Sequence, residues 1–320
     1  MSLTINQLSK KSESGVNLRD LTFSVERGEI FGILGADQSS KTDILRLLSG
    51  IDKQSSGTIF FDGKPIENGR EAGFYYLGDE TSSRWRNIFS STKTESQAVT
   101  HSNLLRAALP KLKNVFLVEN PVQNLDITET KIICKLIKET TRQNKICTVV
   151  VTNDPLEIFQ LCDRVAILND GMFVQVGTPE EVYTAPNCLA SASLFGNNNL
   201  IAARRLTSSK TAMPEFFTID GEHRIITDQV DKSELGAINQ TIFLAILPEH
   251  LALSFGASFP EDNLLKVKIT QIDFLGPTTA IRMDANGLQL NALVLRTVGL
   301  NIGDECMVGL PPDRIRVLKH

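Results

Sequence analysis

The chain has 320 residues and a formal net charge of −4, and 42% of its residues are hydrophobic. This charge argues against nucleic-acid binding, which depends on an excess of basic side chains facing the phosphate backbone. No apolar run reaches the ~18 residues that a membrane-spanning helix requires, and the N-terminus lacks the apolar stretch of a signal peptide. The five cysteines have no CxxC spacing, so neither a metal site nor a disulfide framework is expected, and a reducing, cytoplasmic setting fits.

Up to about residue 195, short apolar segments alternate with segments of helical periodicity. Residues 2–35 predict short strands, and residues 43–49 predict a helix that ends at Gly50. Further strands are expected at "SGTIFFDGKPI", "NVFLVENP", "ICTVVVTND" and "RVAILNDGMFVQVG", and further helices at "DITETKIICKLIKETTRQNK" and "PLEIFQLC". Asp126 is the expected cap of the longer helix. Strands that alternate with helices predict a parallel α/β sheet for residues 1–195.

The pattern changes near residue 196, where "GNNNLIAARRLTSSK" is polar and typical of a linker. From there to residue 320 the sequence consists mostly of short alternating segments, such as "TIFLAIL", "LKVKITQIDFL" and "LQLNALVL". Alternation of period two predicts strands, and many short strands predict a small all-β barrel. We therefore place a domain boundary between residues 195 and 196.

The segment "GADQSSKT", residues 35–42, lies between an expected strand and an expected helix. A phosphate-binding loop has the pattern G-x-x-x-x-G-K-[ST], in which the glycines let backbone N–H groups approach the phosphates. Gly35, Lys41 and Thr42 match this pattern, whereas Ser40 replaces the second glycine. The loop therefore has the outline of a nucleotide site but lacks one of its backbone requirements.

Six segments, taken in order, resemble the ATP-binding subunits of ABC transporters. They are "LRDLTFSVERGEIFGILG", the loop at residues 35–42, "LRLLSGIDKQSSGTIFFDGKPI", "VFLVENPVQNLD", "VVVTND" and "CDRVAILNDGMFVQVGTPEEVYTAP". The later segments "VQVGTPEEVYTAPN" and "ILPEHLALS" resemble the importer subgroup with an appended TOBE domain, which includes ATPases for sugars, polyamines and ferric iron. The resemblance implies a P-loop NTPase-like α/β domain over residues 1–195 and an OB-like, all-β TOBE barrel over residues 196–320.

The same resemblance implies which residues would hold a nucleotide. The candidates in the degenerate phosphate-binding loop are Gly35, Ser39, Ser40, Lys41 and Thr42. Glu119 stands at the Walker B position whose aspartate supports Mg²⁺, so Thr42 and Glu119 are the candidate metal ligands. Asp126 is the D-loop aspartate. ATP with Mg²⁺ is therefore the cofactor that the family resemblance implies.

Several positions depart from the family pattern. Asn120 occupies the position of the catalytic glutamate, and an amide cannot accept a proton from water at neutral pH. Asn153 replaces the switch histidine, Leu77 the Q-loop glutamine and Gln38 another loop glycine. "TKTESQAV" precedes the helix "SNLLRAALPKL" without the glycine pair of the signature motif, and the short spacing predicts a reduced helical subdomain between residues 78 and 103. We therefore expect no catalytic residue, and ATP and Mg²⁺ binding that is weak or lost.

Two carboxylates add negative charge where a phosphate would bind. Asp37 lies within the loop, and Asp43 directly follows Thr42. A carboxylate about 6 Å from a phosphate costs roughly 2–3 kcal/mol at an effective dielectric near 20. Asp43 either takes the place of the phosphate at the helix N-terminus or is an ordinary first-turn residue, and both alternatives predict weaker nucleotide binding.

Three functional hypotheses remain open. The first is a non-hydrolysing ABC importer subunit that acts as a scaffold or regulator in solute import. Its partners would be permease subunits or a second ATP-binding subunit, in a homodimer or a heterodimer, at the inner face of the cell membrane. The second is an ATPase with residual or unusual activity that uses Lys41, Thr42 and Glu119. The third is a module that binds a small ligand through its TOBE-like barrel, with Arg282 in "FLGPTTAIR" as the best candidate.

Overall fold

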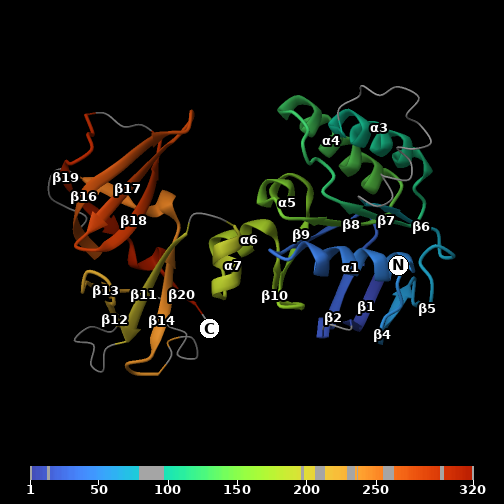
Figure 1. The fold of residues 1–320 in the computed structure, drawn as a ribbon, viewed down its shortest axis with the longest axis horizontal. Coiled ribbons are helices and arrows are strands. Elements are labelled where there is room, and N and C mark those ends of the chain that lie inside the picture. The colour runs from blue at the N-terminus through green and yellow to red at the C-terminus, as the bar shows by residue number, and fades with distance from the viewer. Residues whose placement is uncertain are drawn as a thin grey trace. The chain divides into compact units, whose positions relative to one another are not determined.

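The computed structural model describes residues 2–12, 15–78, 97–195, 198–205, 213–228, 235, 237–254, 263–295 and 299–318. The chain forms two compact units, one that extends to Val182 and one that begins at Tyr183 (Figure 1). Residues 79–96 lie outside this description. They include most of the segment for which the sequence predicts a reduced helical subdomain, and most of the stretch that lacks the signature glycines. Both expectations therefore stay predictions.

The first unit is built around a six-stranded sheet. In spatial order its strands are β10 (Met172–Gly177), β9 (Arg164–Asn169), β3 (Ile30–Leu34), β8 (Cys147–Thr152), β7 (Val115–Glu119) and β6 (Phe74–Leu77). All neighbours pair in parallel except β10, which pairs antiparallel with β9. β3, β7 and β8 are buried along their whole length, which explains why their sequences are continuous apolar runs. The predicted parallel α/β sheet is confirmed.

Helices cover both faces of this sheet (Figure 1). One face carries α1 (Gln38–Ser49), and the other carries α3 (Gln97–Ala108), α4 (Ile127–Gln143) and α5 (Pro155–Leu161), with the short η1 (Leu109–Lys111) after α3. β7 shows how one strand serves two cores, because its side chains alternate between the faces. Val115 and Leu117 join the cluster around α1, whereas Phe116 and Val118 join the cluster around α4.

A second, antiparallel sheet closes the α1 side of the first unit. In spatial order its strands are β2 (Gly15–Glu26), β1 (Ser2–Ser12), β4 (Ser56–Phe61) and β5 (Lys64–Ile66). Leu3 and Ile5 of β1 are fully buried and belong to the same apolar cluster as Ile44 of α1. This cluster fixes α1, so the loop that precedes α1 is held at the end of β3.

The second unit consists of two five-stranded antiparallel sheets. The first contains β13 (Arg224–Ile226), β12 (Glu215–Thr218), β11 (Asn199–Arg205), β14 (Thr241–Ile246) and β20 (Arg316–Leu318). The second contains β15 (Ala252–Ser254), β19 (Glu305–Leu310), β16 (Asn263–Phe274), β17 (Thr279–Ala285) and β18 (Leu288–Val294). Two one-turn segments, η2 (Pro248–His250) and η3 (Pro312–Arg314), connect strands. The predicted all-β domain is confirmed.

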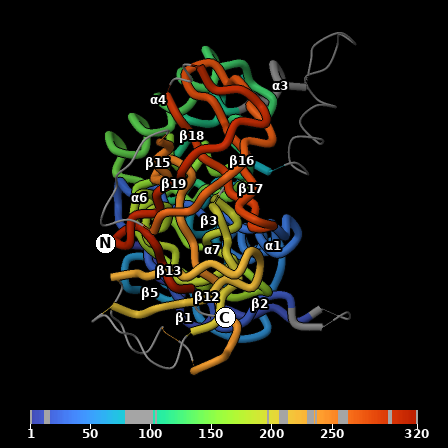
Figure 2. The backbone as a smooth tube through the Cα atoms, turned by 90° about the vertical axis from the view of Figure 1, so that its left-hand side faces the viewer, coloured from blue at the N-terminus to red at the C-terminus, as the bar shows by residue number. Residues whose placement is uncertain are grey.

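One apolar core joins the two sheets of the second unit. Figures 1 and 2 both show the β11–β14 sheet at one end of this unit and the β16–β19 sheet at the other. Buried side chains from both sheets, among them Phe216, Leu244, Ile281 and Val308, form a single cluster. Along β16 the buried residues Leu265, Val267 and Ile269 alternate with exposed ones, as the period-two pattern of the sequence requires.

Two short helices lie near the junction of the units, α6 (Pro179–Thr184) and α7 (Leu189–Leu194). Ala192 of α7 is fully buried in a small cluster with Ala245 and Leu318 of the β sheet, and Leu189 packs against it. α7 therefore belongs to the second unit. The structural boundary lies before α7, between Val182 and Tyr183, whereas the sequence places the boundary after α7, at residue 195. None of the described helices is long and apolar enough to cross a membrane.

We predict that the fragment 183–320 is more stable than the fragment 196–320. The shorter fragment lacks α7, so it exposes the apolar surface around Ala245 that Ala192 covers. The expected loss is about 2 kcal/mol of unfolding free energy, the order expected for uncovering part of an apolar cluster. Urea unfolding of both purified fragments measures the difference. Equal stability would place the boundary at residue 195, as the sequence alone suggests.

Candidate nucleotide site

The loop after β3 is closed by one of its own side chains. α1 begins at Gln38, and Asp37 is its N-cap residue. The Asp37 carboxylate accepts hydrogen bonds from the backbone N–H groups of Ser39 (3.0 Å) and Ser40 (3.2 Å) and from both serine hydroxyls. The Ser40 hydroxyl, with help from Ser39, lowers the pKa of Asp37. Two of the N–H groups that could bind a phosphate at this helix N-terminus are therefore already occupied by an anion.

Lys41 is the second closed element of the loop. Its side chain is fully buried, and its ammonium group donates to the backbone oxygens of Gly35 and Asp37 (3.1 Å to the latter) and to the side-chain oxygen of Asn153. Burial lowers the pKa of Lys41 to about 8, although the carboxylates of Asp37 and Glu119 act in the opposite direction. Three acceptors thus satisfy the three N–H donors of this ammonium group.

The two candidate metal ligands contact each other directly. Glu119, at the end of β7, is 4% exposed, and its Oε1 accepts from the hydroxyl of Thr42 at 2.5 Å and from the Gln38 amide. The Tyr76 hydroxyl lies 3.4 Å from Oε2 of the same carboxylate. Across the described part of the chain, no group of three or more His, Cys, Asp or Glu side chains is arranged to hold a metal ion. Thr42 and Glu119, the two candidate metal ligands, therefore lie together as a hydrogen-bonded pair.

These contacts decide whether a nucleotide with Mg²⁺ fits the loop as it stands. Each predicted phosphate or metal ligand in the loop has an intramolecular partner: Ser39 and Ser40 bind Asp37, Lys41 binds Asn153, and Thr42 binds Glu119. A phosphate would have to displace the Asp37 carboxylate from the same N–H groups. The residues present do not fit Mg²⁺-ATP in this arrangement.

Gly35 has a packing role that is independent of phosphate. A β-carbon at this position would lie 2.6 Å from the backbone oxygen of Leu168 on the adjacent strand β9. Any other residue would therefore push the loop away from the sheet. The first glycine of the pattern is required here by the fold alone.

The hypothesis that Asp43 takes the place of the phosphate is wrong. The predicted helix start near residue 43 is also wrong, because α1 begins at Gln38 and Asp43 lies in its second turn. The Asp43 carboxylate is 2.6 Å from the ammonium of Lys10 and 3.2 Å from the amide of Asn17, both on the antiparallel sheet. Asp43 thus ties α1 to that sheet. Asp37 is the N-cap residue, and its side chain therefore accepts from the free N–H groups at the start of the helix.

Asn120, Asn153 and Asp126 are placed by the loops at the ends of β7 and β8. Asn120 has a left-handed backbone with φ of 44°, and its N–H donates to Val151 at 2.8 Å. Asp126 caps α4 by accepting from the N–H of Glu129 at 2.8 Å, as predicted. Asn153 is committed to Lys41 through its side-chain oxygen. Asn153 thus belongs with Lys41 and Asp126 forms a separate helix cap, whereas Asn120 is held through its backbone.

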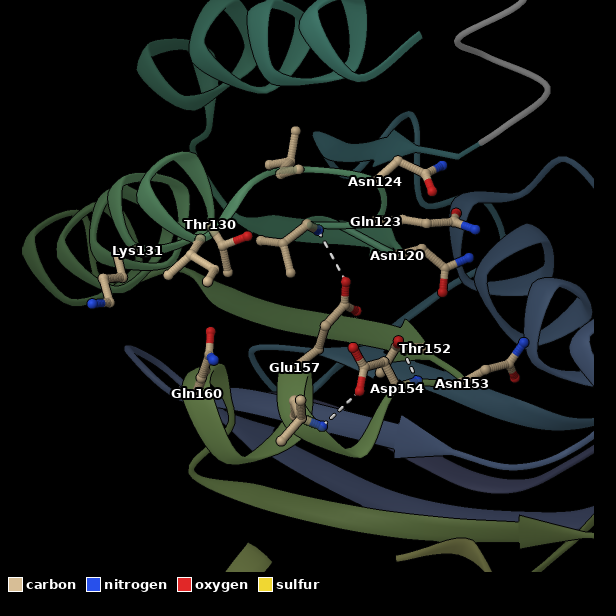
Figure 3. Close-up of a pocket in the computed structure, with 14 residues that line it drawn as sticks. Asn120, Gln123, Asn124, Thr130, Lys131, Thr152, Asn153, Asp154, Glu157 and Gln160 are labelled. Carbon is tan, nitrogen blue, oxygen red and sulfur yellow. Dashed lines mark hydrogen bonds between the residues drawn. The ribbon is translucent and has the colours of Figure 1, made fainter. Parts of the chain in front are cut away.

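Beside this network lies a cavity of about 400 Å³ that the sequence did not reveal (Figure 3). It is bounded by the loop after β7, the start of α4, the end of β8 and α5. Glu157 of α5 lies in its lining, is only 3% exposed, and accepts from the N–H of Val122 at 3.1 Å. Burial raises the pKa of Glu157 to about 7, despite the opposing effects of the Thr152 hydroxyl and the Val122 N–H. A charged residue within the otherwise amphipathic segment "PLEIFQLC" is the signal that could have found it.

We predict that Glu157 makes stability depend on pH. Its folded pKa of about 7 lies above the ordinary value of 4.5, so the folded protein holds an extra proton between these pH values. The free energy of unfolding therefore falls as the pH rises from 4.5 through 7, by at most about 3 kcal/mol. Glu157→Gln removes this dependence. Relative to wild type, it should be more stable at pH 8 than at pH 4.5, as measured by urea unfolding.

The control for this measurement is Glu71→Gln, which neutralises an exposed glutamate. It should shift stability equally at both pH values. A Glu157→Gln curve parallel to that of wild type from pH 4.5 to 8 would show that the Glu157 carboxyl titrates normally.

Comparison with known proteins shows which families two parts of the chain match. The ABC transporter family profile matches residues 18–155, and the TOBE domain profile matches residues 244–318. The Fe(3+) ions import ATP-binding protein FbpC 2 of Rhizobium meliloti is 26% identical, over 93% of this chain and 86% of its own length. The glucose import ATP-binding protein GlcV of Saccharolobus solfataricus is 27% identical, over 99% of each chain. The sulfate/thiosulfate import ATP-binding protein CysA of Halalkalibacterium halodurans is 24% identical, over 89% of this chain and 87% of its own length. Residues 18–155 thus form an ABC transporter domain and residues 244–318 a TOBE domain, in a chain that is similar along most of its length to import ATP-binding proteins.

Proposed function

We propose that the chain is an importer ATP-binding-type subunit that does not hydrolyse ATP and acts as a scaffold or regulatory subunit. The observation that carries this proposal is the closed loop at residues 35–42, in which the Asp37 carboxylate takes the anion position at the N-terminus of α1. The relatives named for Fe(3+), glucose and sulfate import support a role in solute import.

The amides at the two family positions for the catalytic glutamate and the switch histidine support the same proposal. Hydrolysis needs a group that accepts a proton from the attacking water, and Asn120 and Asn153 both carry amides that cannot do so near neutral pH. Asn153 is also held by the Lys41 ammonium, so its side-chain oxygen is not available to a substrate. We infer that any nucleotide that binds is released again without being hydrolysed.

Family resemblance supports the partners and the location that we propose. An importer subunit of this kind would contact permease subunits and a second ATP-binding subunit, at the cytoplasmic face of the membrane. The second subunit could be another copy or a different chain, because the contacts that close the loop lie within one chain in either case.

A second candidate function is an ATPase with residual or unusual activity. One observation favours it: Lys41, Thr42 and Glu119 are kept close together around the end of β7. The third hypothesis, a ligand site at Arg282 of the barrel, is not favoured. Arg282 donates to Gln271 at 3.0 Å and to Asn291 on the two neighbouring strands, which is a structural use of its guanidinium group.

We predict that Asp37→Gly increases the affinity for ATP at least tenfold. The substitution removes the carboxylate that competes with phosphate for the N–H groups of Ser39 and Ser40, and tenfold corresponds to about 1.4 kcal/mol. Glycine is an acceptable N-cap residue, so the fold should lose only a few tenths of a kcal/mol. Calorimetric titration with Mg²⁺-ATP measures the affinity.

Asp43→Asn is the matched control for charge, because it removes one carboxylate that contacts Lys10 and Asn17 instead of the loop N–H groups. It should change ATP affinity by less than Asp37→Gly does. Equal gains from both substitutions would mean that general negative charge, and not occupation of the N–H groups, limits binding.

We also predict that wild-type protein shows no ATP hydrolysis above background. Lys41→Ala should leave the measured rate unchanged, because Lys41 has no turnover to support. Asn120→Glu combined with Asn153→His should still be inactive, because the sequence lacks the signature glycines. Phosphate release under steady-state conditions measures all three proteins. Wild-type turnover that disappears in Lys41→Ala would establish the second candidate function in place of the first.

A further inference from the structure

The cavity between the β7–α4 loop and α5 has the size and chemistry of a binding site, and the closed nucleotide loop does not use it. Its volume of about 400 Å³ is within the range of small-molecule sites, roughly 300–1,000 Å³. Its lining combines a larger apolar surface with polar groups, among them five side-chain amides: Asn120, Gln123, Asn124, Asn153 and Gln160. Amides offer both donors and acceptors, so they suit a ligand with several polar groups.

The charge of the lining is negative when Glu157 is ionised. Asp154 and Glu157 contribute two carboxylates, and Lys131 contributes one ammonium group at the α4 end (Figure 3). The Asp154 carboxylate is partly satisfied, because it caps α5 by accepting from the N–H of Leu156 at 2.8 Å. The remaining uncompensated carboxylate is that of Glu157.

Glu157 itself lacks one hydrogen-bond partner. Its Oε1 accepts from the Val122 N–H, and the Thr152 hydroxyl lies near enough to lower the pKa of the carboxyl, but its buried Oε2 has no hydrogen-bond partner among the residues that the structure describes. Figure 3 shows this side chain directed from α5 toward the β7–α4 loop, between the side chains that line the cavity. Buried carboxylate oxygens are rarely left unpaired, because an unpaired buried acceptor is costly. A positively charged donor would give Oε2 its missing hydrogen bond and would balance the negative charge of the Glu157 carboxylate.

We propose that this cavity binds a small organic cation, through an ammonium or guanidinium group that pairs with the Glu157 carboxylate. The amides of Asn124 and Gln160 also line the cavity and offer acceptors for further N–H groups of the ligand. The absence of an aromatic side chain from the lining disfavours a flat ring that would need a stacking surface. This proposal is independent of whether the closed loop binds ATP.

Calorimetric titration with propylammonium and methylguanidinium chloride tests the proposal, with 1-propanol as the uncharged control. At pH 8 at least one of the two cations should bind to wild type, and 1-propanol should bind at least tenfold more weakly. Glu157→Gln keeps an oxygen for the Val122 N–H but loses the charge, so it should lose at least tenfold in affinity. Glu71→Gln should bind as wild type does. Absence of binding by both cations, or equal binding to Glu157→Gln, overturns the proposal.

The pH dependence gives a second readout that needs no variant. The probes stay charged between pH 6 and 8, whereas Glu157 gains a proton as the pH falls below about 7. Affinity should therefore fall by up to tenfold per pH unit on the acid side and level off above pH 7. A ¹³C titration of the glutamate carboxyls should show the pKa of Glu157 lowered by a saturating cation. An unchanged Glu157 titration would overturn the proposal even if Glu157→Gln failed to fold.

Discussion

The structure of the candidate site depends on one contact, the Asp37 carboxylate at the N-terminus of α1. A helix N-terminus presents unpaired N–H groups and a partial positive charge. A carboxylate and a phosphate can both accept hydrogen bonds from these N–H groups and supply the opposite charge. Because Asp37 belongs to the chain, it is present at a high effective concentration, and a free anion must compete with it. Ser40, which replaces the second glycine of the pattern, and its neighbour Ser39 add two hydroxyl donors to the same carboxylate.

The rest of the loop follows from this contact. With the anion position filled, Lys41 has no phosphate to reach, and it turns inward to backbone oxygens and Asn153. An amide at residue 153 suits this role, since its oxygen accepts from an ammonium at any pH near neutrality. Glu119 accepts from Thr42 and Gln38. Three substitutions that look like separate losses in the sequence are thus paired around the loop: Ser40 donates to Asp37, Asn153 accepts from Lys41, and Gln38 donates to Glu119.

The sequence predicted the architecture because the signals for it are local and repeated. Buried runs such as that of β7 and alternating runs such as that of β16 mark the two kinds of sheet, and Asp126 marks a helix start. The network was only partly predictable. The N-cap role of Asp37 follows from a pattern that the sequence contains, but the choice between Asp37 and Asp43 depends on where α1 begins. The partners of Asp43 and Glu157 depend on tertiary contacts with Lys10 and Val122, which no local pattern reports.

The central claim is that the Asp37 carboxylate occupies the anion position of the loop. An NMR titration that follows the Asp37 carboxyl together with the Ser39 and Ser40 amides tests it most directly. The account predicts that both amide resonances change as Asp37 is protonated, with a pKa below its ordinary value of 3.8. It also predicts that neither amide responds at neutral pH to ATP and Mg²⁺ at concentrations that saturate ordinary nucleotide sites. The account would be contradicted if the Ser39 and Ser40 amide resonances did not change as Asp37 titrates, or if they shifted to saturation with micromolar ATP.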